Sequence, residues 1–191
     1  MPAQLGIASV RSPIPSCEFP YGGKGFSYSD GYRKQNSIYT AEGALALAIE
    51  NTPDALSESN VLVLGFGFLG RETAVLFRKV GANITVATND ILERDMCLKM
   101  EFKTLYLHEL KERRDNIILN TIPANVLFDE MIASDCQGIL IELASIPCTS
   151  PDFKALPIIS GSALPGRFSP RSAAKLMFRD INQMLKEADY E

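Results

Sequence analysis

The sequence lacks an excess of basic residues, because 19 Lys and Arg stand against 23 Asp and Glu for a formal net charge of −4. Proteins that bind nucleic acid carry a basic footprint, and attachment to anionic lipid needs clustered Lys and Arg. No apolar run approaches the roughly 18 residues of a transmembrane helix, and the N-terminus lacks the basic and then apolar pattern of a signal peptide. We therefore expect neither nucleic acid nor a membrane as a partner.

Paired cysteines and clustered histidines are also missing. Cys17, Cys97, Cys136 and Cys148 form no C-x-x-C pair and match no zinc spacing, so we expect no metal site and interpret them as free thiols in a reducing cytoplasm. The only histidine, His108, lies in a charged stretch and is expected at the surface. The sequence thus offers no histidine as a general base, and the catalytic residues are left unassigned.

Residues 1–36 are rich in Ser, Pro and Gly, which interrupt the periodicity of helices and strands. We interpret them as a loop-rich N-terminal segment, ahead of a single domain over residues 37–191. The glycines of 22–25 lack both the spacing and the preceding strand of a phosphate-binding P-loop. Regular structure is expected to start with a helix over 41–51, with Thr40 as its N-cap.

The rest of the chain alternates between short apolar runs and amphipathic stretches. Strands are predicted over 61–64, 84–88, 103–107, 117–120, 138–143 and 156–160. Helices are predicted over 71–80, 90–100, 108–113, 124–133 and 170–188, with Asp90 and Glu93 as an acidic capping box. This order predicts an α/β fold, a Rossmann-type doubly wound parallel sheet in three layers (αβα).

The stretch from Gly65 to Gly70 reads G-x-G-x-x-G, directly after a buried strand and at the start of a helix. Gly65 would make the tight turn, Gly67 would let the backbone approach a pyrophosphate, and Gly70 would let the helix pack closely on the strand. Phe68 and Leu69 place their backbone N–H groups at the helix N-terminus, where phosphates bind. These five residues are the main candidates for cofactor binding; a tight turn without a ligand is the alternative.

The kind of dinucleotide depends on the end of the second strand. An NAD site usually has an acid about 20 residues after the glycines, to bind the ribose 2′-hydroxyl. Counted from Gly70, this position is Thr88, which is not acidic. Thr88 and Asn89 would instead donate hydrogen bonds, and Arg94 would reach a 2′-phosphate unless it is a solvated surface residue. We therefore expect NADP as the preferred cofactor, with NAD as the alternative.

Several blocks together resemble the A subunit of dipicolinate synthase. They comprise residues 36–44, 61–70, 119–124, 141–145, 164–166 and 169–172, and the resemblance extends over 36–188. The resemblance implies an NADP-binding domain of an enzyme that makes dipicolinate from a dihydrodipicolinate precursor during sporulation, together with a partner, the flavoprotein B subunit. The family's second strand typically ends in an Ala-Arg sequence, and Thr88 and Asn89 depart from it.

The family also has a substrate-side domain ahead of the Asn36-Ser37 block, where this sequence has only 35 residues. Three explanations of this difference are open: the chain is a truncated form, another chain supplies the substrate domain, or catalysis has been lost. The function predicted is therefore that of an NAD(P)-binding oxidoreductase component with a small-molecule substrate. A non-catalytic nucleotide-binding or assembly module, or a degenerate paralogue, is the alternative, and a homo-oligomer is kept open.

Further candidates follow from the strand ends and the family blocks. Parallel strands place their carboxyl ends at the ligand crevice, which makes the ends of the fourth and fifth strands candidates for the nicotinamide side; a rigid turn and simple packing are the alternatives. The resemblance adds candidates on the substrate side. One of them is Glu42, for which the alternative role is to stabilise the N-terminal end of its helix. The cofactor-side candidates are Thr121, Ile122, Pro123, Ala144 and Ser145, and the substrate-side candidates are Ser37, Thr40, Glu42, Leu164, Pro165 and Gly166.

Overall fold

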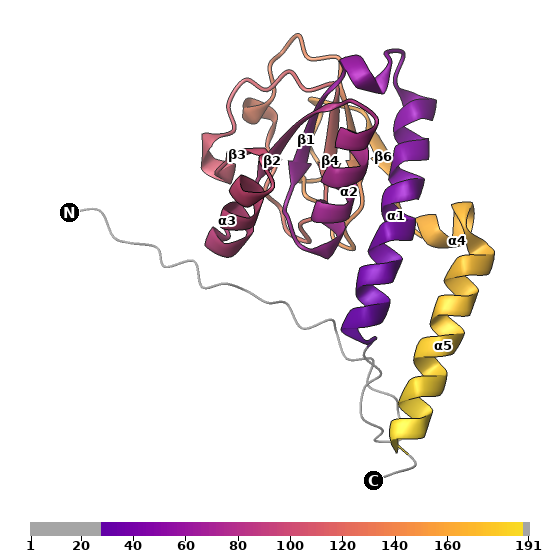
Figure 1. Cartoon of the computed structure of the whole chain (residues 1–191). Helices are drawn as coiled ribbons and strands as arrows, with labels where there is room; N and C mark the ends of the chain where they lie inside the picture. Colours follow the sequence, from indigo (N-terminus) through magenta and orange to yellow (C-terminus); the bar gives the residue numbers. More distant parts are fainter. Residues whose placement is uncertain (1–27, 189–191) are drawn as a thin grey trace.

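A computed structural model describes residues 28–188 (Figure 1). Its centre is a six-stranded parallel sheet in the order β3-β2-β1-β4-β5-β6, which is the doubly wound order of dinucleotide-binding domains. The strands are β1 (Asn60–Leu64), β2 (Asn83–Ala87), β3 (Lys103–Leu105), β4 (Ile117–Asn120), β5 (Ile139–Glu142) and β6 (Ile158–Ser160). The predicted fold class is confirmed. The predicted division after residue 36 stays a prediction, because residues 1–27 lie outside the described part.

The helices are α1 (Asp30–Asn51), α2 (Phe68–Lys79), α3 (Ile91–Lys99), α4 (Leu164–Phe168) and α5 (Pro170–Ala188), with short 3-10 helices at Leu56–Glu58, Leu107–Glu109 and Asp129–Met131. Side chains of β1 alternate between the two faces of the sheet. Val61 and Val63 pack into a core shared with α1, α2 and α3, whereas Leu62 and Leu64 belong to a second core on the opposite face. A strand that is buried on both faces is typical of a parallel sheet.

The second face of the sheet is covered by loops and 3-10 helices. A helix over 124–133 was predicted there and is wrong, because only Asp129–Met131 forms a helical turn in this fully described stretch. The backbone N–H groups of Val126 and Leu127 both donate to the carbonyl of Cys148. The Asp129 carboxylate accepts from the N–H groups of Lys154 and Ala155, at 2.9 and 2.8 Å. The loop that contains Cys148 thus satisfies the N–H groups of Val126 and Leu127, and Asp129 in turn satisfies the backbone of Lys154 and Ala155, so these contacts hold the segment without a helix.

The first helix begins about three turns earlier than the sequence predicted. Thr40 is not its N-cap: Ser29 caps α1 by accepting from the N–H of Tyr32, and Thr40 lies inside the helix with its hydroxyl bonded to the carbonyl of Asn36. Ser29 also donates to the buried carboxylate of Asp180 on α5. This bond joins the start of α1 to α5, and the two helices lie side by side (Figure 1).

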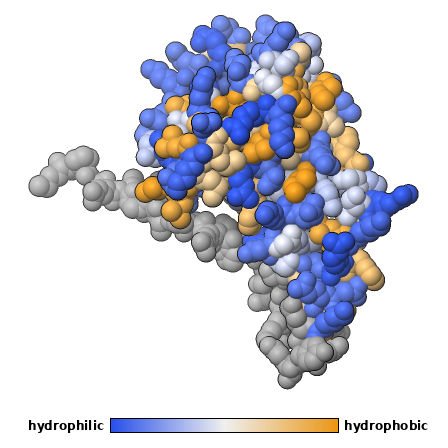
Figure 2. All heavy atoms as spheres, in the orientation of Figure 1, coloured by the Kyte–Doolittle hydropathy of each residue, from blue (hydrophilic) through white to orange (hydrophobic). Residues whose placement is uncertain are grey.

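Apolar surface, shown in orange, gathers over the region of α3 in Figure 2. Ile91 and Leu92, at the start of that helix, each expose 77% of their surface, although neither belongs to a core. In residues 28–188 no helix combines the length and the apolar character that a membrane span requires.

Candidate dinucleotide-binding site

The glycine loop between β1 and α2 has the geometry predicted for each of its three glycines. Gly65 has a positive φ of 88°, which other residues rarely adopt. A Cβ on Gly70 would lie 2.2 Å from the carbonyl oxygen of Gly65, so that only glycine lets α2 approach β1 this closely. A Cβ on Gly67 would instead meet only the Glu93 carboxylate, at 3.7 Å. The loop therefore presents an open backbone surface at Gly67.

Helix α2 begins at Phe68, immediately after this opening, with Gly67 as its N-cap. Among the described residues, no side chain caps the helix, and its first turn has no acid. The first N–H groups of a helix have no intrahelical partner and lie at the positive end of the helix dipole. Such an end provides donors and a favourable potential for an anion such as a pyrophosphate.

A hollow of about 810 Å³ lies over this helix end, at the carboxyl edge of the sheet. It is large enough for a cofactor, since ligand sites typically measure about 300–1,000 Å³. It brings together ten of the thirteen residues predicted for the cofactor: Gly65, Gly67, Phe68, Leu69, Gly70, Thr88, Asn89, Thr121, Ile122 and Pro123. Their role in binding stays a prediction, although one surface now joins three separate loops of the sequence.

Arg94, Ala144 and Ser145 lie outside this hollow. The guanidinium of Arg94 stacks on the ring of Tyr106, 3.7 Å from its centroid, and its Nη1 is enclosed by protein. The cation–π contact holds the Arg94 side chain on Tyr106 in this structure, and its predicted contact with a 2′-phosphate stays a prediction. The Ala144 N–H donates to Glu142, and Ser145 is exposed. The predicted role of both residues at the nicotinamide side stays a prediction.

Glu93 is the residue that sequence reasoning missed. Asp90 caps α3 as predicted, since its carboxylate accepts from the N–H groups of Leu92 and Glu93. The Glu93 carboxylate, however, does not close the predicted capping box. Its Oε2 accepts from the N–H of Phe66 at 2.8 Å and from the hydroxyl of Thr88 at 2.6 Å. Glu93 therefore joins the glycine loop to the end of β2 and lines the hollow.

The ends of β4 and β5 are joined by a polar pair, the buried Asn120 and the half-buried Glu142. Asn120 is fully buried, and its amide donates to the carboxylate of Glu142 and to the carbonyl of Ile122. The Asn120 oxygen accepts from the N–H of Ile122, which fixes the turn after β4. The next residue, Thr121, donates its hydroxyl to the carbonyl of Leu64 at 2.7 Å. The polar groups of Asn120 and Thr121 thus fix the turn after β4, and the predicted role of Thr121 at the nicotinamide side stays a prediction.

The substrate-side candidates on α1 lie outside the hollow. The buried hydroxyls of Ser37 and Thr40 donate to carbonyls of their own helix, those of Arg33 and Asn36, each at 2.8 Å. Glu42 is exposed on the same helix. The structure thus gives Ser37 and Thr40 a local role in α1, and their predicted contact with a substrate stays a prediction.

Residues 164–166, which were predicted on the substrate side, lie outside the hollow. They begin the short helix α4, which packs on α1: a Cβ on Gly43 would lie 2.7 Å from the Cβ of Leu164. Leu164 is fully buried, Pro165 is half-buried in the first turn, and Gly166 is exposed. This segment therefore packs closely on α1, and its predicted role on the substrate side stays a prediction.

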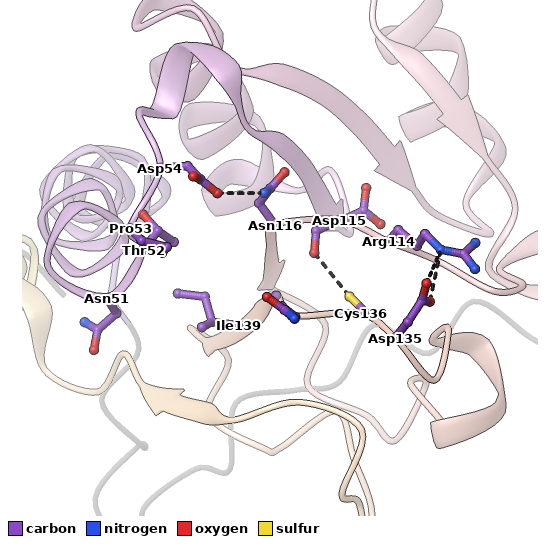
Figure 3. Close-up of a pocket in the computed structure, with 12 residues that line it drawn as sticks. Asn51, Thr52, Pro53, Asp54, Arg114, Asp115, Asn116, Asp135, Cys136 and Ile139 are labelled. Atoms are coloured by element: carbon purple, nitrogen blue, oxygen red, sulfur yellow. Dashed lines mark hydrogen bonds and ion pairs between the residues drawn. The ribbon is translucent and has the colours of Figure 1, made fainter.

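A smaller hollow of about 310 Å³ lies at the opposite edge of the sheet, where β4 and β5 begin (Figure 3). Its polar groups are bonded to one another: Arg114 contacts Asp135, and the Asn116 amide donates to Asp54 at 3.4 Å. Ligands of doubly wound sheets bind at the carboxyl ends of the strands. The larger hollow at the glycine loop is therefore the candidate site.

Other chemistry-bearing groups lie apart from the site. His108 is exposed and stacks on Tyr106, as the predicted surface position requires. Within residues 28–188, no group of three or more His, Cys, Asp and Glu side chains could hold a metal ion.

The described cysteines are expected to differ in reactivity. Burial raises the pKa of the Cys97 thiol to about 12, with a smaller effect from the Glu93 carboxylate, and burial also raises the pKa of Cys148. At pH 8 only about one Cys97 in ten thousand is then a reactive thiolate. In a Cys17→Ser background, iodoacetamide should modify the half-buried Cys136 well before Cys97 and Cys148. Mass spectrometry of a time course measures this order, and equal rates for Cys97 and Cys136 would contradict it.

The sequence is 31% identical over 164 residues to the A subunit of dipicolinate synthase from Bacillus subtilis (strain 168), which covers 82% of this chain and 55% of that protein. The chain is a homologue of part of that protein. The crystal structure of the B. subtilis protein matches with a TM-score of 0.77 at 28% identity, over 85% of this chain and 57% of that one. The crystal structure of the corresponding protein from Bacillus halodurans matches with a TM-score of 0.71 at 27% identity, over 82% of this chain and 56% of that one. No family model matches.

The chain thus spans about half the length of the dipicolinate synthase proteins that it matches. A transhydrogenase from Sinorhizobium meliloti shares the fold, with a TM-score of 0.67 at 14% identity, over 82% of this chain and 56% of that one. The predicted resemblance to the A subunit of dipicolinate synthase is confirmed, and it rests on most of the chain as well as on the glycine motif.

Proposed function

We propose that this chain binds a nicotinamide dinucleotide at the glycine loop and supplies the cofactor-binding part of an oxidoreductase similar to the A subunit of dipicolinate synthase. The observation that carries the proposal is the opening at Gly67, where backbone and the uncapped start of α2 meet a hollow of about 810 Å³. The 31% identity to the dipicolinate synthase protein supports the choice of reaction. The substrate proposed is therefore a dihydrodipicolinate-like acid, which would be oxidised to dipicolinate.

The residues fit such a cofactor in distinct ways. The backbone N–H groups at the start of α2 would bind the pyrophosphate, and Gly67 leaves the space that the phosphates need. The exposed side chains of Ile91 and Leu92, on the rim of the hollow, would cover the adenine. Thr121 and Ile122 would shape the nicotinamide end. When bound, the nicotinamide supplies hydride transfer.

A flavoprotein B subunit is the partner that the resemblance to dipicolinate synthase proposes, and a cytoplasmic role in sporulation comes with the same proposal. In the described part of the hollow, the titratable side chains are Asp90 and Glu93, both at the α3 end. The nicotinamide end is lined by Thr121, Ile122, Pro123 and Ala124, none of which is a general acid or base at neutral pH. We therefore propose that a partner chain or the substrate-side domain supplies the proton-handling groups.

Replacing Gly67 with valine should remove dinucleotide binding without unfolding the chain. The new side chain would project into the space left for the pyrophosphate, and its Cβ would meet no protein atom nearer than 3.7 Å. We expect affinity for the reduced cofactor to fall about a hundredfold or more, a loss of about 2.7 kcal/mol. Fluorescence titration measures the affinity, and urea unfolding measures the stability.

The matched control for Gly67→Val is Gly31→Val, on the exposed first turn of α1, where the nearest atom to a new Cβ is 3.7 Å away. It should bind the cofactor like the wild type. Unchanged affinity of Gly67→Val would show that the cofactor does not lie against the glycine loop.

A non-catalytic nucleotide-binding module is the second candidate, and the absence of titratable side chains among the described residues at the nicotinamide end favours it. The two candidates separate in a turnover assay with dihydrodipicolinate and the dinucleotide, run with and without a flavoprotein B subunit. Turnover in either condition supports the oxidoreductase. Tight dinucleotide binding without turnover in both conditions supports the module.

A further inference from the structure

We propose that Glu93 makes this site selective for NAD(H) over NADP(H), by placing its carboxylate where the 2′-position of the adenosine ribose would lie. This inference rests on the proposed dinucleotide binding. It reverses the preference for NADP that the sequence suggested, because that preference depended on Thr88 as a neutral donor and on Arg94 as a phosphate ligand.

The position of the carboxylate follows from its two bonds. In dinucleotide-binding folds, the acid that holds the ribose lies at the end of the second strand, beside the glycine turn. Strand β2 ends at Ala87, and the next residue, Thr88, donates to Glu93 at 2.6 Å. The same oxygen accepts from Phe66, inside the glycine turn, at 2.8 Å. The end of β2 itself has no acid. Glu93, in the first turn of α3, places its carboxylate at that position instead.

The second carboxylate oxygen faces the cofactor space. Both donors bond to Oε2, whereas Oε1 is the atom that a Cβ on Gly67 would meet, at 3.7 Å. A carboxylate oxygen in this position would accept a hydrogen bond from a ribose hydroxyl, and a charge-assisted bond of this kind is stronger than a neutral one. A 2′-phosphate in the same place would meet a like charge, which raises the free energy of the complex.

The other charged groups near this position do not offset the repulsion. Asp90 lines the same hollow and adds a second acid, since its carboxylate caps α3. Arg94 stacks on Tyr106, outside the hollow. The hydroxyl of Thr88 already donates to Glu93, and the Asn89 oxygen accepts from the N–H of Leu107 at 3.0 Å. The balance of charge at this end of the hollow is therefore negative, which favours the cofactor with the smaller charge.

The test compares the dissociation constants of NADH and NADPH for the whole chain and for Glu93→Gln. Glutamine keeps the size and an accepting oxygen for Phe66 and Thr88, but removes the charge. The wild type should bind NADH at least about tenfold more tightly, a difference of about 1.4 kcal/mol. In Glu93→Gln this ratio should fall about tenfold, mainly through tighter binding of NADPH. Because salt screens like charges, the preference of the wild type should also shrink as ionic strength rises.

The matched control is Asp95→Asn, which removes one negative charge from the exposed side of the same helix, where Asp95 contacts Lys99. It should leave the ratio unchanged. Equal affinities in the wild type, tighter NADPH, or an unchanged ratio in Glu93→Gln would overturn the role of Glu93 while leaving dinucleotide binding in place. Absence of binding for both cofactors would instead overturn the proposed function.

Discussion

Replacing Gly70 with valine should destabilise the fold by about 3 kcal/mol or more, a large share of the stability of a typical domain. The new Cβ would lie 2.2 Å from the carbonyl oxygen and 2.8 Å from the carbonyl carbon of Gly65, both of them backbone atoms. Backbone atoms cannot swing aside as the end of a flexible side chain can. Helix α2 would therefore have to move away from β1 and weaken the core that it shares with Val61 and Val63.

Urea unfolding of Gly70→Val measures this loss, and Gly31→Val is again the control. Gly31 lies on the exposed start of α1, where a new Cβ would make only an ordinary contact, 3.7 Å from the Ser29 hydroxyl, so its variant should unfold within about 0.5 kcal/mol of the wild type. Together with Gly67→Val, the series separates two roles within one motif. Gly70→Val should lose stability, and Gly67→Val should lose binding. Wild-type stability of Gly70→Val would contradict the close packing of α2 on β1.

The second large effect is expected for Asn120→Asp, which keeps the shape of the buried side chain but sets a carboxylate against that of Glu142. Asn120 is fully buried and donates to Glu142 at 2.5 Å. Two carboxylates this close cannot both ionise without a large cost. The variant should lose about 3 kcal/mol or more of stability at pH 7, since a lost charged hydrogen bond alone costs about 1.5–3 kcal/mol.

The pH dependence distinguishes repulsion from a simple packing defect. A carboxyl that is held protonated in the folded state has a raised pKa there, so its cost is present at neutral pH and disappears below the unfolded pKa values of Asp and Glu, near 4. The deficit of Asn120→Asp relative to the wild type should therefore shrink as the pH falls from 7 to 4. Asn83→Asp, at the exposed start of β2, should show neither effect. A deficit that is constant with pH would contradict the account.

The sequence predicted the sheet well because its signals are local and strong. The apolar run before Gly65 and the glycines themselves define β1, the turn and α2, and each glycine has the geometry expected of it. The segment over 124–133 failed for the opposite reason. Its composition suits a helix, but the N–H groups of Val126 and Leu127 donate to the distant carbonyl of Cys148, and such tertiary contacts leave no periodic signal.

The site was predictable in outline, but the position of the Glu93 carboxylate beside the glycine loop was not. Counting residues from Gly70 led to Thr88, because the rule assumes that the acid lies on the strand. Glu93 was visible, but as part of a capping box, since its spacing from Asp90 fits one. In the structure Asp90 alone caps the helix, and the side chain of Glu93 turns to Phe66 and Thr88. The Glu93 side chain bonds to Phe66 and Thr88 because α3 lies close to the glycine loop in three dimensions, and the sequence does not reveal this contact.

The most direct test of the central claim locates the bound cofactor by NMR of the isotope-labelled chain. On titration with NADH, the account predicts that the amide signals of Gly65, Phe66, Gly67 and Gly70 shift together with that of Glu93. The amides of Asn116 and Gly138, at the opposite edge of the sheet, should stay in place. Shifts at Asn116 and Gly138 without shifts in the glycine loop, or no shifts at saturating NADH and NADPH, would contradict it.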